Sequence, residues 1–136
     1  MKNYRWGILG AGRIADKFCE ALSFTEGSEV FAVASRDANN AKTFAKKHNA
    51  KKQYTNYIDL ITDAEVDVIY IATPHAFHHQ QTLLCLQHNK PVLCEKPLSI
   101  NYQKSAEMVA FAATQQTFLM EGMWTRFMPF TEKILA

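Results

Sequence analysis

Short apolar runs alternate with amphipathic segments along the whole chain. The apolar runs predict strands at residues 4–9, 30–34, 53–54, 67–73, 91–94 and 117–121. Apolar residues at helical spacing predict helices at residues 12–24, 37–48, 57–61, 76–88 and 101–115. This alternation predicts an α/β fold, a doubly wound parallel sheet of six strands in the order 3-2-1-4-5-6.

Helical spacing also predicts which side chains face the sheet. The expected inward residues are Ile14, Phe18, Ala21 and Leu22 in the first helix, Ala41, Phe44, Ala45 and His48 in the second, and Met108, Val109, Ala112 and Ala113 in the last. Asp37 is expected to cap the second helix.

Length and composition indicate one ordinary globular domain. The chain has 136 residues and a net charge of +2, which argues against a nucleic-acid or membrane partner. We interpret the basic cluster of Lys46, Lys47, Lys51 and Lys52 as a solvated helix end and loop. Three widely spaced cysteines, Cys19, Cys85 and Cys94, favour reduced thiols and a cytoplasmic protein.

A glycine turn follows the first strand, in the pattern Gly10-x-Gly12-x-x-Ala15. Gly10 makes the turn, Gly12 lets a pyrophosphate approach the backbone, and Ala15 keeps the helix near the sheet. Arg13 and Ile14 begin the helix whose free N–H groups would face the phosphates. An ordinary glycine turn and an S-adenosylmethionine methyltransferase are the alternatives that we weigh less.

The end of the second strand carries Ser35, Arg36 and Asp37. An acid at the position of Ser35 would bind the ribose 2′-hydroxyl of NAD. An arginine instead pairs with a phosphate and stacks on adenine. The sequence therefore favours NADP as cofactor and leaves NAD possible.

Three histidines crowd together after the fourth strand, at positions 75, 78 and 79. His75 and His79 have a spacing that can bind a metal, but no third ligand lies nearby, so we expect no metal site. They could simply be polar residues at a helix start. We favour a loop, beginning at Thr73 and Pro74, that borders the cofactor at the topological switch point.

Glu95, Lys96 and Pro97 leave the fifth strand at its carboxyl end. A lysine there can hold its ammonium against a substrate oxygen and stabilise a developing alkoxide. Glu95 would orient the lysine or keep it charged, and Pro97 would fix the loop. The alternative is a surface turn with an incidental ion pair.

Together, the motifs GxGxxA, ASRD, IATPHAFHH, CEKPLS and MEGMWTRFMP resemble the nucleotide-binding domain of the Gfo/Idh/MocA oxidoreductases, and most of all its dihydrodiol and D-xylose dehydrogenase branch. The resemblance implies that Lys96 is the catalytic lysine and that Ser35 and Arg36 hold the 2′-phosphate of NADP.

By the same resemblance, Thr73 and His78 line the cofactor and Trp124 lines the substrate pocket. His75 stands where many members have asparagine, so its role does not carry over.

Residues 1–122 are thus expected to form the Rossmann NAD(P)-binding domain. Residues 123–136, which end in an uncapped helical segment, would start the connection to an α+β domain absent from this chain. The full-length parent would be a homo-oligomeric NADP-dependent oxidoreductase acting on a secondary alcohol of a sugar, polyol or trans-dihydrodiol, and the chain alone would be inactive. A non-catalytic nucleotide-binding module or sensor is the alternative.

Overall fold

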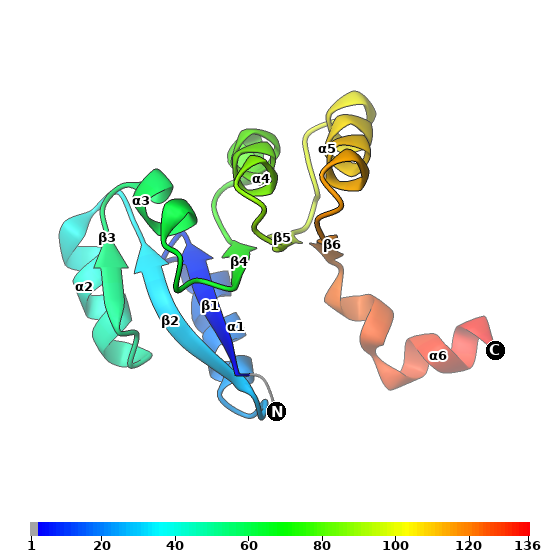
Figure 1. The fold of residues 1–136 in the computed structure, drawn as a ribbon. Helices are drawn as coiled ribbons and strands as arrows, with labels where there is room; N and C mark the ends of the chain where they lie inside the picture. The colour runs from blue at the N-terminus through cyan, green and yellow to red at the C-terminus, as the bar shows by residue number, and fades with distance from the viewer. Residues whose placement is uncertain (1–2) are drawn as a thin grey trace.

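The computed structural model describes residues 3–136, which form one six-stranded sheet with helices on both faces (Figure 1). The strands are β1 (Tyr4–Leu9), β2 (Ser28–Ala34), β3 (Lys52–Tyr54), β4 (Val68–Ile71), β5 (Val92–Glu95) and β6 (Leu119–Gly122). All are parallel, in the order β3-β2-β1-β4-β5-β6. The doubly wound fold and its strand order are confirmed.

The connections between the strands are helical, as predicted. The helices are α1 (Arg13–Leu22), α2 (Ala38–Lys47), α3 (Tyr57–Thr62), α4 (His78–Gln87), α5 (Tyr102–Thr114) and α6 (Pro129–Leu135). Two short 3₁₀ turns, η1 (His75–Phe77) and η2 (Trp124–Phe127), precede α4 and α6.

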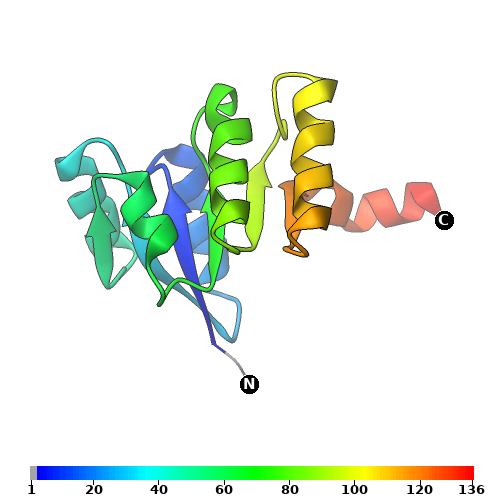
Figure 2. The same ribbon diagram turned by 45° about the horizontal axis from the view of Figure 1, so that its top comes forward.

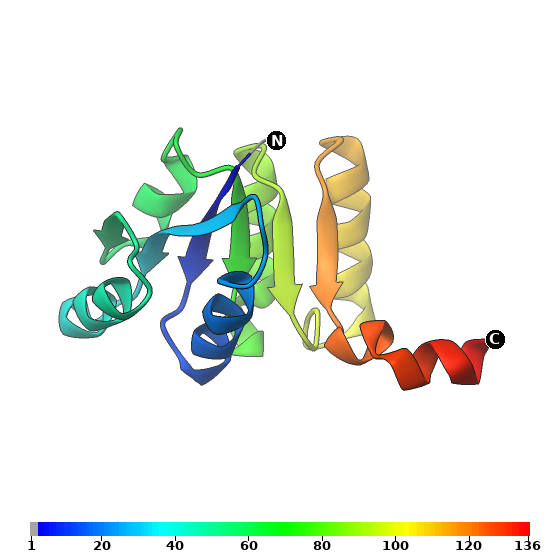
Figure 3. The same cartoon turned by 90° about the horizontal axis from the view of Figure 1, so that it is seen from below.

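Two clusters of buried apolar side chains pack the helices against the sheet. On one face, Leu60, Leu86 and Ala112 bring α3, α4 and α5 against the strands. On the other, Ala15 of α1 and Phe44 of α2 pack on the strands. Figure 2 shows α4 and α5 standing on the same side of the sheet. Seen from below, α1 and α2 lie on the opposite side, where no helix of residues 3–136 covers β5 and β6 (Figure 3).

The inward stripe predicted for the first helix is wrong in part. Phe18 and Leu22 do pack inward, but Ile14 is 43% exposed and Ala21 is exposed. Ala15 and Cys19 are buried instead. The inward face therefore consists of Ala15, Phe18, Cys19 and Leu22, and the small side chains of Ala15 and Cys19 let the helix lie close to the strands.

The stripe predicted for the last long helix is also too wide. Met108 and Ala112 are buried, whereas Val109 is 57% exposed and Ala113 is exposed. Because α5 lies beside the edge strand β6, only a narrow line of its side chains reaches the strands. The stripe of α2 is as predicted: Ala41, Phe44 and Ala45 are buried, and His48 is nearly so.

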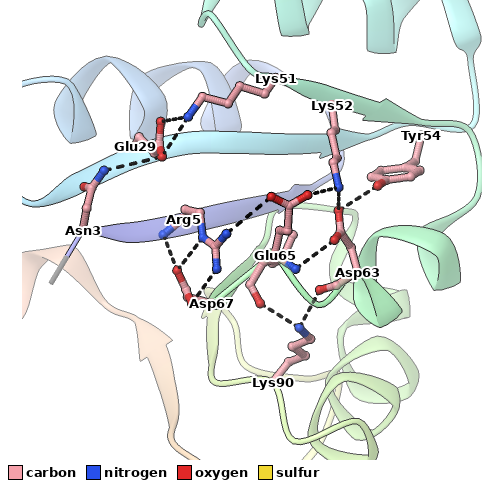
Figure 4. Close-up of polar contacts among 11 residues, drawn as sticks. Asn3, Arg5, Glu29, Lys51, Lys52, Tyr54, Asp63, Glu65, Asp67 and Lys90 are labelled. Carbon is pink, nitrogen blue, oxygen red and sulfur yellow. Dashed lines mark hydrogen bonds and ion pairs between the residues drawn. The ribbon is translucent and has the colours of Figure 1, made fainter.

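A polar network lies at the amino ends of the strands, opposite the glycine turn (Figure 4). Arg5 pairs with Asp67 at 3.1 Å and with Glu65 at 3.6 Å. Asp63 accepts from Lys52 at 2.9 Å and from the Tyr54 hydroxyl at 2.8 Å. This network ties β1 and β3 to the connection between α3 and β4.

Three lysines of the basic cluster are engaged in ion pairs rather than free. Lys47 pairs with Asp16, Lys51 with Glu29, and Lys52 with Asp63 and Glu65. Lys46 is exposed.

Beyond β6, the chain leaves the sheet. Helix α6 projects away from the other elements (Figures 1 and 3), and its Phe130, Ile134 and Leu135 are 53%, 73% and 78% exposed. None of the helices in residues 3–136 has the length and apolar character needed to cross a membrane.

Candidate functional site

The glycine turn joins three strands at their carboxyl ends. Gly10 has φ +94°, and a Cβ there would lie 3.1 Å from the backbone of Ala72 at the end of β4. Its N–H donates to the carbonyl of Ala34 at the end of β2. Gly10 is therefore required both for its backbone conformation and for the close approach of three chains.

Gly12 has a different reason to be glycine. It is the N-cap of α1 with extended backbone, at φ −99° and ψ −174°, which any residue can adopt. A Cβ built on it meets nothing within 4 Å. The missing side chain thus leaves open space at the amino end of α1, where Gly10, Ala11 and Gly12 line a shallow hollow.

Ser35 and Arg36 lie beside this turn. Ser35 is buried, and its hydroxyl oxygen accepts from the N–H of Asp37 and from the side-chain amide of Asn40, each at 3.4 Å. Asp37 caps α2, accepting from the N–H of Asn40 at 2.9 Å, as predicted. The Asn40 amide also donates to the carbonyl of Ala11 at 3.2 Å. Asn40 therefore links the glycine turn to the end of β2.

Arg36 stands between two hollows. Its guanidinium lies 5.8 Å from the centre of the Phe77 ring. On one side, a small depression is lined by the glycine turn, Ser35, Asn40 and Thr73. On the other, a more apolar pocket of about 300 Å³ runs toward Tyr57 and α4. Arg36 borders both hollows, and an arginine side chain can pair with a phosphate and stack on a flat ring.

The loop after β4 closes this pocket. Thr73 and Pro74 line both hollows, and the Thr73 hydroxyl donates to the side-chain oxygen of Gln81. Two of the histidines differ in their surroundings. The ring of His79 contacts the carboxylate of Glu107 at 2.8 Å, whereas the ring of His78 is buried and lines neither hollow. Within residues 3–136, no three His, Cys, Asp or Glu side chains are arranged to hold a metal ion.

Glu95 organises the end of β5. It is 8% exposed and accepts from the Tyr70 hydroxyl at 2.7 Å and from the N–H of Lys96 at 3.1 Å. Burial, and then the bond to Glu95, raise the pKa of Tyr70 far above its usual range, so its hydroxyl stays a donor. The sequence suggested that Glu95 orients the lysine, and these bonds show that it holds the lysine's backbone.

Lys96 itself projects from this edge into solvent. The peptide bond to Pro97 is cis, and the N–H of Leu98 donates to Glu121 of β6 at 2.8 Å. Since β1, β4 and β5 are neighbouring parallel strands, the loop of Lys96 shares one edge of the sheet with the glycine turn. Trp124 follows β6 at the same edge and is 59% exposed.

Several residues of this site were missed by sequence reasoning. Asn40, Tyr57 and Phe77 line the pocket, while Tyr70 and Glu121 support the loop of Lys96. The only signal in the sequence was indirect: Phe77 is an aromatic residue just after a proline at the switch point. The others lie in helices or strands that gave no hint of contact with the site.

Open space at Gly12, the amino end of α1 and a mostly apolar pocket beside Arg36 together fit a dinucleotide. The fold and this site define a Rossmann-type nucleotide-binding domain. A family model described as "Oxidoreductase family, NAD-binding Rossmann fold" matches residues 4–123. The chain belongs to this family, the Gfo/Idh/MocA oxidoreductases, which confirms the resemblance found in the sequence.

Named relatives are similar over nearly all of this chain. It is 49% identical over 132 residues to trans-1,2-dihydrobenzene-1,2-diol dehydrogenase of Mus musculus, covering 96% of this chain and 40% of that protein. The Homo sapiens enzyme of the same name is 46% identical over 132 residues, which again cover 96% of this chain and 40% of that protein. The chain thus spans about two fifths of the length of these relatives.

A solved relative has the same architecture. KijD10, a 3-ketoreductase from Actinomadura kijaniata in complex with NADP and TDP-benzene, superposes with a TM-score of 0.93 at 28% identity. The match covers 98% of this chain and 41% of that one.

Proposed function

We propose that this chain is the cofactor domain of an NADP-dependent oxidoreductase. The parent protein would transfer a hydride between nicotinamide and a secondary alcohol of a sugar or trans-dihydrodiol. The observation that carries this proposal is the meeting, at one edge of the sheet, of Gly12, Arg36 and Lys96. The names of the relatives support the substrate class, and the NADP bound to KijD10 supports the cofactor.

Each of these residues has a separate task in the proposed reaction. The Ser35 hydroxyl and the Arg36 guanidinium would hold a 2′-phosphate. Lys96 would place its ammonium against the substrate oxygen and stabilise negative charge that develops there. Trp124 would line the substrate pocket. When bound, the nicotinamide supplies the redox chemistry.

We further propose that residues 123–136 begin a connection to a second α+β domain. The uncovered face of β5 and β6 and the exposed apolar side chains of α6 support this. That domain would supply the proton acceptor and the surface for homo-oligomers. The three buried free thiols support a reducing compartment such as the cytoplasm.

The test is turnover by the full-length protein with NADP and a panel of sugars and trans-diols. Lys96→Met should lower kcat about 10²- to 10³-fold and leave NADPH affinity within a few-fold, because only developing charge is affected. Lys46→Met, which removes an exposed lysine on α2, is the control. Unchanged kcat in Lys96→Met would make Lys96 a surface residue; cofactor binding without any turnover would favour a nucleotide sensor.

A further inference from the structure

His78 is a buried histidine between two loops of the site. It is the first residue of α4, and its side chain is 1% exposed. Its Nδ1 lies 2.9 Å from the carbonyl oxygen of Pro97. Its Nε2 lies 2.8 Å from the carbonyl oxygen of Thr73. The ring thus spans the gap between the loop after β4 and the loop that carries Lys96.

Both partners of the ring are acceptors, and this restricts its protonation state. A backbone carbonyl oxygen has no hydrogen to donate, so each ring nitrogen must carry one. A neutral imidazole has a single N–H in either tautomer. With a neutral ring, one nitrogen lone pair would face a carbonyl lone pair at hydrogen-bond distance. Only the imidazolium satisfies both contacts.

The surroundings of the ring act on its charge in both directions. Burial and the amino end of α4 disfavour a cation, as does Lys96 one residue before Pro97. The two carbonyl oxygens favour it. Other ionisable groups on neighbouring elements are engaged elsewhere: Glu95 with Tyr70, Glu121 with Leu98, and Glu107 of α5 with His79. The remaining titratable side chains on the elements packed near the ring are Lys104 on α5 and His75 on η1.

We propose that His78 is a doubly protonated clamp that positions the loop of Lys96 against the loop of Thr73. Loss of one ring proton would break one of the two contacts and free one loop from the other. His78 acts here through the backbone and is a positioning residue. The proposal rests on the two carbonyl contacts and stands whether or not the parent oxidises alcohols.

The direct test is nitrogen NMR of the histidine rings in the full-length protein, near neutral pH and upward. We expect both ring nitrogens of His78 to carry hydrogen near neutral pH. As the ring loses a proton, the backbone amide signals of Lys96 and Leu98 should shift along the same titration curve. A neutral His78 ring near neutral pH would overturn the proposal. So would Lys96 and Leu98 amide signals that do not shift as the His78 ring loses its proton.

Two variants sharpen this test. His78→Gln can donate to only one of the carbonyls in these directions, so the pH response of the Lys96 and Leu98 amides should be lost. His88→Gln, at the exposed far end of α4, should retain it. If His78→Gln does not fold, single variants of the other four of the chain's five histidines assign the His78 signal by elimination.

Activity gives a separate readout. If the parent turns over substrate, kcat should fall on the alkaline side together with deprotonation of the His78 ring, with KM for NADPH changed less. A protonated ring with coupled amides and no turnover would keep the clamp and reject the proposed function.

Discussion

At the scale of single residues, the two glycines of the turn separate stability from binding. Gly10 is held at φ +94° with the backbone of Ala72 against it, whereas Gly12 has ordinary extended backbone and empty space around it. One glycine is needed by the protein itself. The other leaves room for a ligand.

Gly10→Ala should therefore lower the free energy of unfolding by about 1–3 kcal/mol, through backbone strain and the contact with Ala72. Gly12→Ala should change it by no more than about 0.5 kcal/mol but weaken NADPH binding, because its methyl group takes the space in front of α1. Denaturant unfolding and cofactor titration of both variants measure this. A Gly12→Ala protein with normal affinity would show that no phosphate approaches this position.

Arg36 offers the corresponding test of cofactor choice. Arg36→Ala should weaken NADPH binding by about 1.5–3 kcal/mol, the contribution of a hydrogen bond to a charged group. NADH, which has no 2′-phosphate, should be affected much less. Dissociation constants for both cofactors, with Lys42→Ala on α2 as the control for loss of a surface cation, decide this. Equal affinities of the unaltered protein for the two cofactors would contradict the preference for NADP.

At the scale of elements, the sequence predicted each strand and helix within a few residues but not always the inward face. The error in α1 shows why. Apolar character singled out Ile14 and Ala21, yet the sheet contacts Ala15 and Cys19. How closely a helix lies on a sheet depends on the strands opposite it, and helical periodicity alone does not contain that information.

The residues of the candidate site also fall into those that the sequence predicted and those that it did not. Gly10, Ser35 and Lys96 could be found because each follows a strand that periodicity identifies. Asn40 and Tyr70 could not, because they reach the site through bonds between distant segments: Asn40 to Ala11, and Tyr70 to Glu95. The role that we propose for His78 likewise depends on contacts with two distant backbone carbonyls, those of Thr73 and Pro97.

The face of α1 can be tested with a matched pair of substitutions. Ala15→Leu should destabilise the protein by about 1–3 kcal/mol, because the larger side chain pushes the helix off the sheet. Ala21→Leu, on the exposed side of the same helix, should change stability by less than about 0.5 kcal/mol. Unfolding in urea compares them. Equal losses in the two variants would mean that α1 faces the sheet differently.

At the scale of the whole molecule, the two ends of the sheet have separate roles. The carboxyl ends carry the candidate site, while the amino ends carry the polar network of Figure 4. Burial raises the pKa of Asp63, but bonds from the Glu65 N–H, Lys52 and Tyr54 outweigh it, so the pKa is lowered overall. The ionised form of Asp63 is therefore the one that stabilises the fold.

Because its folded-state pKa is lowered, Asp63 contributes stability above the ordinary aspartate value of about 3.9, and this is lost as the pH falls through the folded-state value. Asp63→Asn should cost about 1–3 kcal/mol at neutral pH, and the cost should shrink in acid. NADPH affinity should stay the same. Urea unfolding across acidic pH, with exposed Asp59→Asn as control, measures it; a cost independent of pH would rule out this role.

The strand order also has a consequence for how the chain folds during synthesis. β1 pairs with β2, its neighbour in sequence, but its other edge pairs with β4, which is made only after α2, β3 and α3. On the ribosome, β1 to β3 can associate first, while one edge of β1 stays unpaired until β4 (Val68–Ile71) has been made. Such non-local pairing slows folding and leaves an unpaired edge that other chains can join. We therefore expect the nascent first half of the chain to expose this open strand edge until β4 has been made.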